Sequence, residues 1–219
     1  EISTTTGYSS IYVNAGKGTN EGIELALGYK QKIGQVDWKT TLLWSLNRNK
    51  VNQLLPEYTN DELGVTVRLD EMDVYSMGGA KKRLTVGGSM GDLYANILRT
   101  DEHGHIWLDS KSNTIQTEKN NYIYVGNTNP KYVLSWRNEF FWRGISLGFM
   151  INARVGGRGA SATQAVLDYY GVSETSAKAR DNGGVLVNGY KYDAQSWYQT
   201  VGGNGVDFVG SCYIYDMTN

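Results

Sequence analysis

Apolar and polar residues alternate along two stretches of the chain, and the first covers residues 22–30 and 36–47. Every second position in these runs except Thr40 belongs to an apolar row, while the positions between them carry mostly charged, small or hydroxyl side chains. The apolar row consists of Ile23, Leu25, Leu27, Tyr29, Val36, Trp38, Leu42, Trp44 and Leu46. A period of two residues is typical of β-strands with one apolar face. Because only the short connection "QKIGQ" separates the runs, the pattern predicts a β-hairpin.

The second alternating stretch covers residues 132–143 and 145–156, with a tight turn near Arg143 and Gly144. Its polar face carries serine, arginine, glutamate and asparagine, and Asn138 is the one polar interruption of the apolar row. The row consists of Tyr132, Leu134, Trp136, Phe140, Trp142, Ile145, Leu147, Phe149, Ile151, Ala153 and Val155. The stretch therefore predicts a second β-hairpin, with arms as long as those of the first.

Two long segments, residues 51–131 and 158–211, follow the hairpins and are rich in polar and glycine positions. Connections in compact soluble domains have a median length of only about 4 to 6 residues. Short turns that alternate with long excursions are typical of outer-membrane barrels, whose strands cross the membrane with about 9 to 11 residues and whose long loops are extracellular. We therefore predict an all-β fold, an antiparallel transmembrane β-barrel fragment. Four strands cannot close a barrel, because single-chain barrels have at least about eight, so the fragment would belong to a larger wall.

A soluble β-sandwich that binds carbohydrate or protein at the cell surface is the alternative interpretation. Strands of a sandwich also alternate, because one face packs on a core and the other faces water. Strand spacing alone favours neither architecture. The long excursions and the length of the apolar rows favour the barrel.

Composition narrows the partners and the chemistry. The 219 residues include 21 Lys and Arg against 22 Asp and Glu, so no basic surface for nucleic acid is expected. The single cysteine excludes an intrachain disulfide and a cysteine-based zinc site within the chain. Sixteen Tyr, 6 Trp and 27 Gly against 2 Pro favour strands and loops over helices. No apolar run reaches the 18 residues that a membrane-spanning helix needs, and the N-terminal stretch has no secretion signal.

Catalytic signals are weak. His103 and His105 could form a metal site with Asp101. The spacing places no further ligand beside them, so we expect all three to be solvated loop residues. The acidic group of Asp70, Glu71 and Asp73 is likewise expected to be a solvated loop surface. We therefore predict neither an enzyme nor a metal or cofactor site.

Aromatic residues in the two long segments are the better candidates for contact with a substrate or a protein partner. A flat ring offers an apolar surface to a sugar, and Tyr and Trp also anchor protein interfaces. The candidates are Trp107, Tyr122, Tyr124, Tyr169, Tyr170, Trp197 and Tyr198, with Tyr94 as a further loop aromatic.

Several separated motifs resemble one family of membrane proteins. The run "NAGKGTNEGIELALGYK" followed by "VDWKTTLLWSLNRNKV" resembles a hairpin of the TonB-dependent outer-membrane transporters of the SusC/RagA type. The runs "GDLYANILRTDEHGHIWLD" and "YVGNTNPKYVLSWRNEFFWRGISLGFMINARVGG" are similar to a later loop and hairpin of that family. The tail "CYIYDMTN" is similar to the segment that leads into one of the last barrel strands. The resemblance covers nearly the whole chain in order.

The resemblance implies a 22-stranded barrel in the cell outer membrane, filled by an N-terminal plug. Such a transporter works with a surface lipoprotein of the SusD type to import glycans or peptides, and TonB drives the import. This chain lacks the plug, the TonB-binding segment and most barrel strands, so it is expected to be a C-terminal fragment of the barrel. Its expected partners are the lipoprotein, membrane lipid and the substrate, with TonB acting through the missing N-terminal region.

Overall fold

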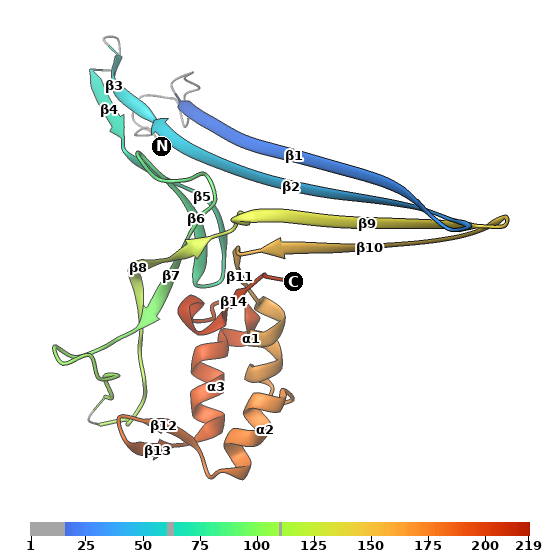
Figure 1. The fold of residues 1–219 in the computed structure, drawn as a ribbon. Coiled ribbons are helices and arrows are strands. Elements are labelled where there is room, and N and C mark those ends of the chain that lie inside the picture. The colour runs from blue at the N-terminus through green and yellow to red at the C-terminus, as the bar shows by residue number, and fades with distance from the viewer. Residues whose placement is uncertain (1–15, 61–63, 110) are drawn as a thin grey trace.

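A long four-stranded antiparallel sheet dominates the computed structural model of this protein, which describes residues 16–60, 64–109 and 111–219 (Figure 1). The strand order is β1-β2-β9-β10. The strands are β1 (Lys17–Ile33), β2 (Val36–Gln53), β9 (Tyr132–Trp142) and β10 (Ile145–Val155). The sheet extends as an arm from the rest of the molecule, and both hairpin turns lie at its far tip. The prediction of an antiparallel, mainly β fold is confirmed.

The first hairpin turn is shorter than predicted, and the second lies at the predicted residues. The first is formed by Gly34 and Gln35 alone, because the flanking residues "QKI" continue β1. The second is formed by Arg143 and Gly144, with φ values of 45° and 87°. Positive φ at both central residues is the geometry whose twist matches that of paired strands. β1 and β2 also extend beyond the predicted runs, so the first hairpin is longer than the second.

The pairing register aligns the apolar rows of all four strands on one face of the sheet. Leu27 pairs with Leu42, which pairs with Trp136, which pairs with Ile151. The same register on the opposite face aligns Lys30 of β1 with Lys39, Glu139 and Gly148 of the other three strands. We call the first surface the apolar face and the second the polar face.

An aromatic ladder crosses the apolar face near the tip and explains the polar interruption at Asn138. The distances between successive ring centroids are 5.9 Å from Tyr29 to Trp38, 6.3 Å from Trp38 to Phe140, 6.3 Å from Phe140 to Phe149 and 6.0 Å from Phe149 to Trp136. Asn138 is buried beside this ladder, where its Oδ1 accepts a hydrogen bond from Trp38 Nε1 at 3.1 Å. The asparagine therefore satisfies an indole N–H that would otherwise lack a partner in an apolar layer.

The first long segment contains two further sheets that the sequence did not predict. A hairpin leads into a four-stranded antiparallel sheet of order β5-β6-β7-β8, and an extended loop with two isolated bridges separates β7 from β8. The strands are β3 (Leu55–Asn60), β4 (Val65–Leu69), β5 (Glu71–Met77), β6 (Ala80–Thr85), β7 (Asp92–Leu98) and β8 (Thr117–Asn127).

The second long segment folds mainly into helices, which the sequence did not predict. Ser161, Ser173 and Asp193 cap the three α-helices, each by accepting a backbone N–H three residues later. The elements are β11 (Arg158–Ala160), α1 (Ala162–Tyr169), α2 (Glu174–Asp181), β12 (Val185–Val187), β13 (Tyr190–Tyr192), α3 (Ala194–Gly202), η2 (Gly203–Gly205), η3 (Gly210–Tyr213) and β14 (Ile214–Asp216). Among the described residues, none of the helices is both long and apolar enough to span a membrane.

One hydrophobic core joins the two long segments. Phe208 and Val209 are fully buried in it, between the helices and the sheet of β5 to β8. The other buried members are Ala80, Leu98, Ile115, Ala165, Val187, Tyr192, Val201 and Tyr213. The backbones meet closely at Gly79, where an added Cβ would lie 2.3 Å from the Phe208 carbonyl oxygen. The segments therefore form one folded unit at the base of the arm (Figure 1).

The acidic group at residues 70–73 is exposed to solvent, as predicted, but it lies on and beside strand β5 rather than in a loop, and its members form ion pairs. Asp73 on β5 receives hydrogen bonds from Arg83 Nε and Lys81 Nζ on β6, both at 2.7 Å. Glu71 pairs with the same Arg83 at 3.0 Å, while Asp70 pairs with Arg68. The hydrogen bond from Arg83 holds the pKa of Asp73 below its usual 3.8, and Lys81 acts in the same direction against the opposing effect of burial.

We expect Asp73→Asn to reduce stability at neutral pH and to remove part of its acid dependence. A carboxyl with a lowered pKa in the folded state stabilises the fold above its unfolded pKa and loses this effect as the pH falls through the lowered value. The stabilisation by Asp73 should therefore begin to decline as the pH falls below about 4 and be lost only below the lowered pKa. Urea unfolding midpoints at several pH values measure it. Asp70→Asn, at an exposed local pair, is the matched control, and equal pH profiles for both variants would contradict the assignment.

Candidate functional site

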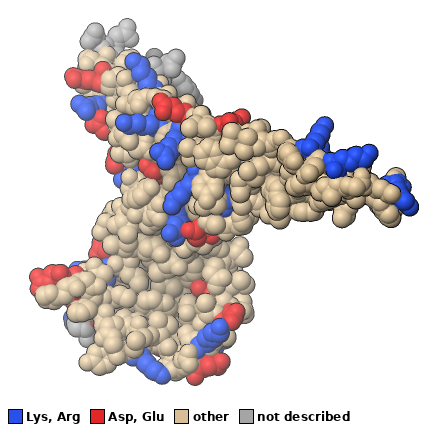
Figure 2. Space-filling model, viewed as in Figure 1, with Lys and Arg blue, Asp and Glu red and all other residues tan. Residues whose placement is uncertain are grey.

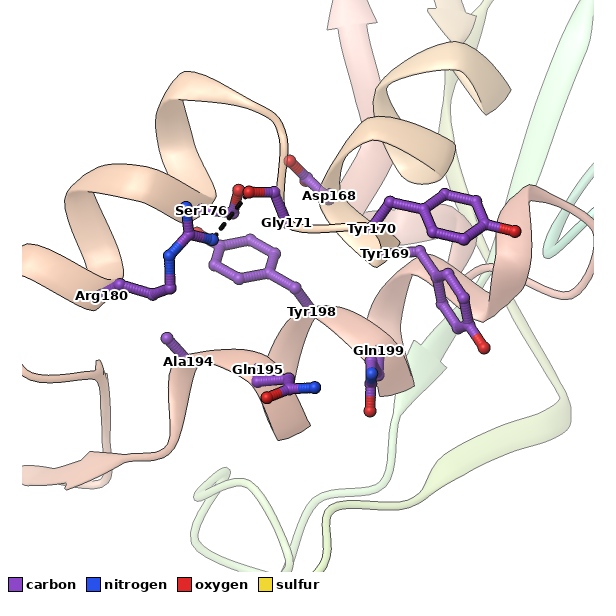
Figure 3. A pocket seen from close by; sticks show the side chains of 10 residues that line it. All are labelled: Asp168, Tyr169, Tyr170, Gly171, Ser176, Arg180, Ala194, Gln195, Tyr198 and Gln199. Carbon is purple, nitrogen blue, oxygen red and sulfur yellow. Dashed lines mark hydrogen bonds between the residues drawn. The ribbon is translucent and has the colours of Figure 1, made fainter.

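A pocket of about 420 Å³ opens between the three α-helices (Figure 3). α3 lies along one side of it, and α1, α2 and the turn between them form the other. Its volume falls in the range of small-molecule sites, which is about 300 to 1,000 Å³. The lining residues are Asp168, Tyr169, Tyr170, Gly171, Ser176, Arg180, Ala194, Gln195, Tyr198 and Gln199.

Arg180 is the cation of this pocket, and a glycine makes room for it. Its Nη1 donates a hydrogen bond to the Gly171 carbonyl oxygen at 2.7 Å. Gly171 has a φ of 70°, and an added Cβ would lie only 2.8 Å from Nη1. In the part of the chain that the structure describes, no carboxylate lies within 4.0 Å of the guanidinium. A guanidinium has five N–H donors, so this one can still donate to a ligand.

Tyr198 supplies a neutral hydroxyl at the centre of the lining. Burial raises the pKa of Tyr198, and the nearby Asp168 carboxylate adds to the rise. The phenol therefore keeps its proton at neutral pH and can both donate and accept a hydrogen bond. Asp168 itself is buried, and its Oδ1 accepts from Gln164 Nε2 and Thr175 Oγ1, both at 2.9 Å. These bonds fix the wall on the α1 side.

Three of the aromatic residues predicted from the sequence meet at this pocket. Tyr169 and Tyr170 end α1 with their rings 5.1 Å apart and nearly perpendicular, and Tyr198 comes from the middle of α3. In Figure 3 the Tyr198 ring lies beside the end of the Arg180 side chain, while the Tyr169 and Tyr170 rings lie at the other end of the lining. The helices thus bring together residues from separate parts of the chain.

The other four predicted aromatics lie elsewhere. Trp197 packs on the hydrophobic core, with its ring 6.4 Å from that of Tyr192. Trp107 lies under the Arg99 guanidinium at 4.3 Å. Two belong to the surface of the sheet of β5 to β8, where Lys81 Nζ is 3.6 Å from the Tyr122 ring and Tyr124 contacts Tyr94 at 5.7 Å.

Arg180, Gln195 and Gln199 line the pocket but were not singled out from the sequence. The spacing of Gln195 and Gln199 places both on one face of a helix, which is a usable signal only when the helix is recognised. The cap residue Asp193 with Ser196 three residues later marks the start of that helix. The hydrogen bond from the Ser196 backbone N–H, with a contribution from the Ser196 side chain, lowers the pKa of Asp193.

The histidines near β7 form an exposed turn. Asp101 Oδ1 accepts the backbone N–H groups of His103 and His105, both at 2.9 Å, and the bond from His105 is the main cause that lowers the pKa of Asp101. The two imidazole centroids are 6.4 Å apart. No group of three or more metal-ligating side chains occurs among the described residues.

The fold and the pocket define a class, an antiparallel β protein in which a helical unit lies at the base of a long sheet. The pocket offers rings for stacking and amide, hydroxyl and guanidinium groups for hydrogen bonding, which suits a polar ligand such as a sugar or a peptide. Comparison of the sequence with protein-family models and with curated proteins finds no match for this chain.

Proposed function

We propose that this chain is part of an outer-membrane, TonB-dependent transporter of the SusC/RagA type. In this proposal the sheet of β1, β2, β9 and β10 belongs to the barrel wall, and the unit formed by the two long segments lies on the extracellular side. The complete transporter imports glycans or peptides together with a SusD-like lipoprotein. In this proposal the chain forms part of the barrel wall and part of the surface that binds substrate or the lipoprotein, and it performs no chemical step.

The exposed apolar face is the observation that carries the proposal. Ile23, Leu25, Leu27 and Tyr29 of β1 and Leu147, Phe149 and Ile151 of β10 are all exposed, and Trp136 between them is exposed as well. Figure 2 shows that the middle of the arm carries no Lys, Arg, Asp or Glu on the visible side, whereas cationic side chains gather toward the tip. An apolar surface of this extent is unfavourable in water and typical of contact with lipid or another protein.

The dimensions of the sheet suit a hydrocarbon layer. β9 and β10 have 11 residues each, and at about 3.4 Å per residue they span roughly 37 Å. With the usual tilt of about 40°, this length crosses roughly 28 Å, close to the roughly 25 Å apolar band of outer-membrane barrels. The aromatic ladder near the tip corresponds to one of the two aromatic girdles of such barrels.

The polar face suits the interior of a barrel. Lys39 Nζ lies 3.3 Å from Glu139 Oε2 across β2 and β9, and Arg137 reaches the same carboxylate from the same strand. Strands of barrel proteins alternate between a lipid-facing and a polar lumen-facing side chain. A soluble sandwich would instead need a second sheet over the apolar face, and the described residues provide none there.

The topology also favours the barrel. Both two-residue turns lie at the tip, and both long segments leave from the other end of the arm (Figure 1). Barrels have short periplasmic turns and long extracellular loops, so the helical pocket would face the outside. There it could contact substrate or the lipoprotein that closes over it.

Substitutions in the pocket test the proposed role. We expect Tyr170→Ala and Arg180→Gln, made in the intact transporter, to weaken lipoprotein association or uptake of glycan or peptide about 2- to 10-fold, the range of one lost stacking contact. Pull-down with the lipoprotein and growth on defined glycans and peptides measure these effects. Tyr190→Ala is the matched control, because Tyr190 is 80% exposed on β13 and lies outside the pocket.

Two outcomes contradict different parts of the proposal. If both pocket variants bind the lipoprotein and support growth like the control, the pocket is not a contact site. If the protein does not fractionate with outer membranes and stays monomeric and soluble without detergent, the transporter assignment fails as a whole, and the sandwich alternative replaces it.

A further inference from the structure

A second cleft lies where the arm meets the folded unit. β2 and β9 are paired from Val36 with Trp142 up to Ser45 with Val133, and beyond that pair they separate. β2 continues beside β1, while residues 127–131 lead into β9 from the other side. The opening between them has a volume of about 660 Å³. Its lining consists of Trp44, Leu46, Asn47, Arg48, Asn49, Ser89, Asn127, Asn129, Pro130, Lys131 and Tyr132.

The charges that line this cleft are all positive. Arg48 and Lys131 are its only ionisable side chains apart from the Tyr132 phenol. Within the described ranges, neither cation forms an ion pair within 4.0 Å. Glu21 pairs with Arg48 in the strand register but lies outside this distance. An anionic group could therefore enter the cleft without displacing an existing carboxylate partner.

The carboxylates around the cleft already have other partners. Asp92 is buried and accepts hydrogen bonds from the Ser89 N–H at 2.8 Å and the Asn127 amide at 2.9 Å. Asp216 is the carboxylate near Lys131, and hydrogen bonds from Thr218 are the main cause of its lowered pKa. Lys131 contributes only after these bonds and after Arg158.

The cleft is continuous with the apolar face. Trp44, Leu46 and Arg48 alternate along β2 and therefore point to the same side as Leu42, and Tyr132 belongs to the apolar row of β9. Along this side, from the arm outwards, the side chains are first aliphatic and aromatic, then Trp44, Leu46 and Tyr132, and then Arg48, while Asn47 and Asn49 line the cleft from the other side of β2. In the orientation proposed above, this is the order of acyl chains, interface and headgroups in the outer leaflet.

We propose that this cleft binds the headgroup of a phosphorylated glycolipid of the outer leaflet, with the acyl chains lying on the apolar face below it. Arg48 and Lys131 bind the phosphates, and the asparagine amides donate to sugar hydroxyls. Trp44 and Tyr132 contact the junction between headgroup and acyl chains. The site rests on the proposed membrane location and adds a lipid ligand that substrate import does not require.

Lipid A provides the probe. The protein, purified in detergent, is titrated with lipid A that carries both phosphates, with dephosphorylated lipid A and with inorganic pyrophosphate, and bound ligand is counted by native mass spectrometry. We expect the phosphorylated lipid to bind about 10-fold or more tightly than either other probe, because charge-assisted hydrogen bonds require the phosphate and the apolar face requires the acyl chains.

Charge-removing variants locate the site. Arg48→Gln combined with Lys131→Gln should abolish the preference for the phosphorylated lipid, while Arg48→Lys, which keeps the charge, should retain it. Lys32→Gln combined with Arg143→Gln removes the same charge at the tip of the arm and should leave binding unchanged. The same circular dichroism spectrum for all variants shows that the fold is retained.

Several outcomes would overturn the inference. Equal binding of phosphorylated and dephosphorylated lipid, equal loss in the tip variant, or pyrophosphate binding as tightly as the lipid would each do so. Lipid binding is measured independently of uptake. If the protein prefers phosphorylated lipid A but the transporter imports no substrate, only the transporter proposal is contradicted. Normal import with no lipid selectivity contradicts only this site.

Discussion

Leu27→Arg is expected to prevent most of the protein from assembling in the outer membrane. Leu27 lies in the middle of the apolar face, is 54% exposed and is aligned with Leu42 on β2. A charge at the bilayer midplane of a lipid-facing strand costs roughly 2 to 4 kcal/mol. Folding titrations into lipid vesicles, and the amount of protein in the outer-membrane fraction, measure the loss.

The neighbouring residue provides the control for this prediction. Gly28 points to the polar face, where it pairs with Thr41, and a Cβ added there meets no atom within 4 Å. Gly28→Arg should therefore assemble nearly as well as the unchanged protein. If both arginines cause the same loss, the two faces of the sheet do not differ in environment, and the lipid-facing assignment of the apolar face is wrong.

Phe208→Ala is expected to destabilise the folded unit by about 3 to 5 kcal/mol, the usual cost of deleting a fully buried ring. Phe208 is completely buried and contacts Tyr213, with the two ring centroids 5.6 Å apart. A Cβ added at Gly78 would lie 2.3 Å from Phe208 Cε1, so the backbone of the β5–β6 turn packs directly on the ring. Loss of the ring should release the helices from the sheet of β5 to β8.

Limited proteolysis between residues 160 and 215 and the thermal midpoint of the helical circular dichroism signal measure this release. Val206→Ala is the matched control, because Val206 lies two residues earlier and is 67% exposed. It should change stability by less than about 0.5 kcal/mol, as exposed substitutions usually do. Equal proteolysis of the two variants would mean that Phe208 does not hold the two long segments together.

The strands of the long sheet were predictable because their pattern is local. Alternation with a period of two assigns each residue to a face, and it therefore places Leu27, Leu42 and Trp136 on the same face of the sheet, as the structure does. Asn138 shows the limit of this reasoning. Its role depends on the Trp38 indole, which comes from a strand far away in the sequence.

The helices and the pocket were not predictable in the same way. Each helix has only 8 or 9 residues, too few for a clear period, and their caps are single polar residues in a segment rich in them. Arg180 and Tyr198 face one cavity only because α2 and α3 pack together. Such tertiary contacts leave no mark in the local sequence, and the glycine that admits Arg180 resembles any loop glycine.

The pairing of β2 with β9 has a consequence for the order of folding. Each hairpin can close within microseconds because its strands are adjacent in the chain. Joining them requires the ends of the whole first long segment to meet, and the entropy of closing so large a loop makes such contacts slow to form. A segment that has already folded keeps its ends close together. The pairing of β2 with β9 should therefore form only after the sheet of β5 to β8 has folded. Mutations inside that sheet should slow this pairing, although they change no residue of either hairpin.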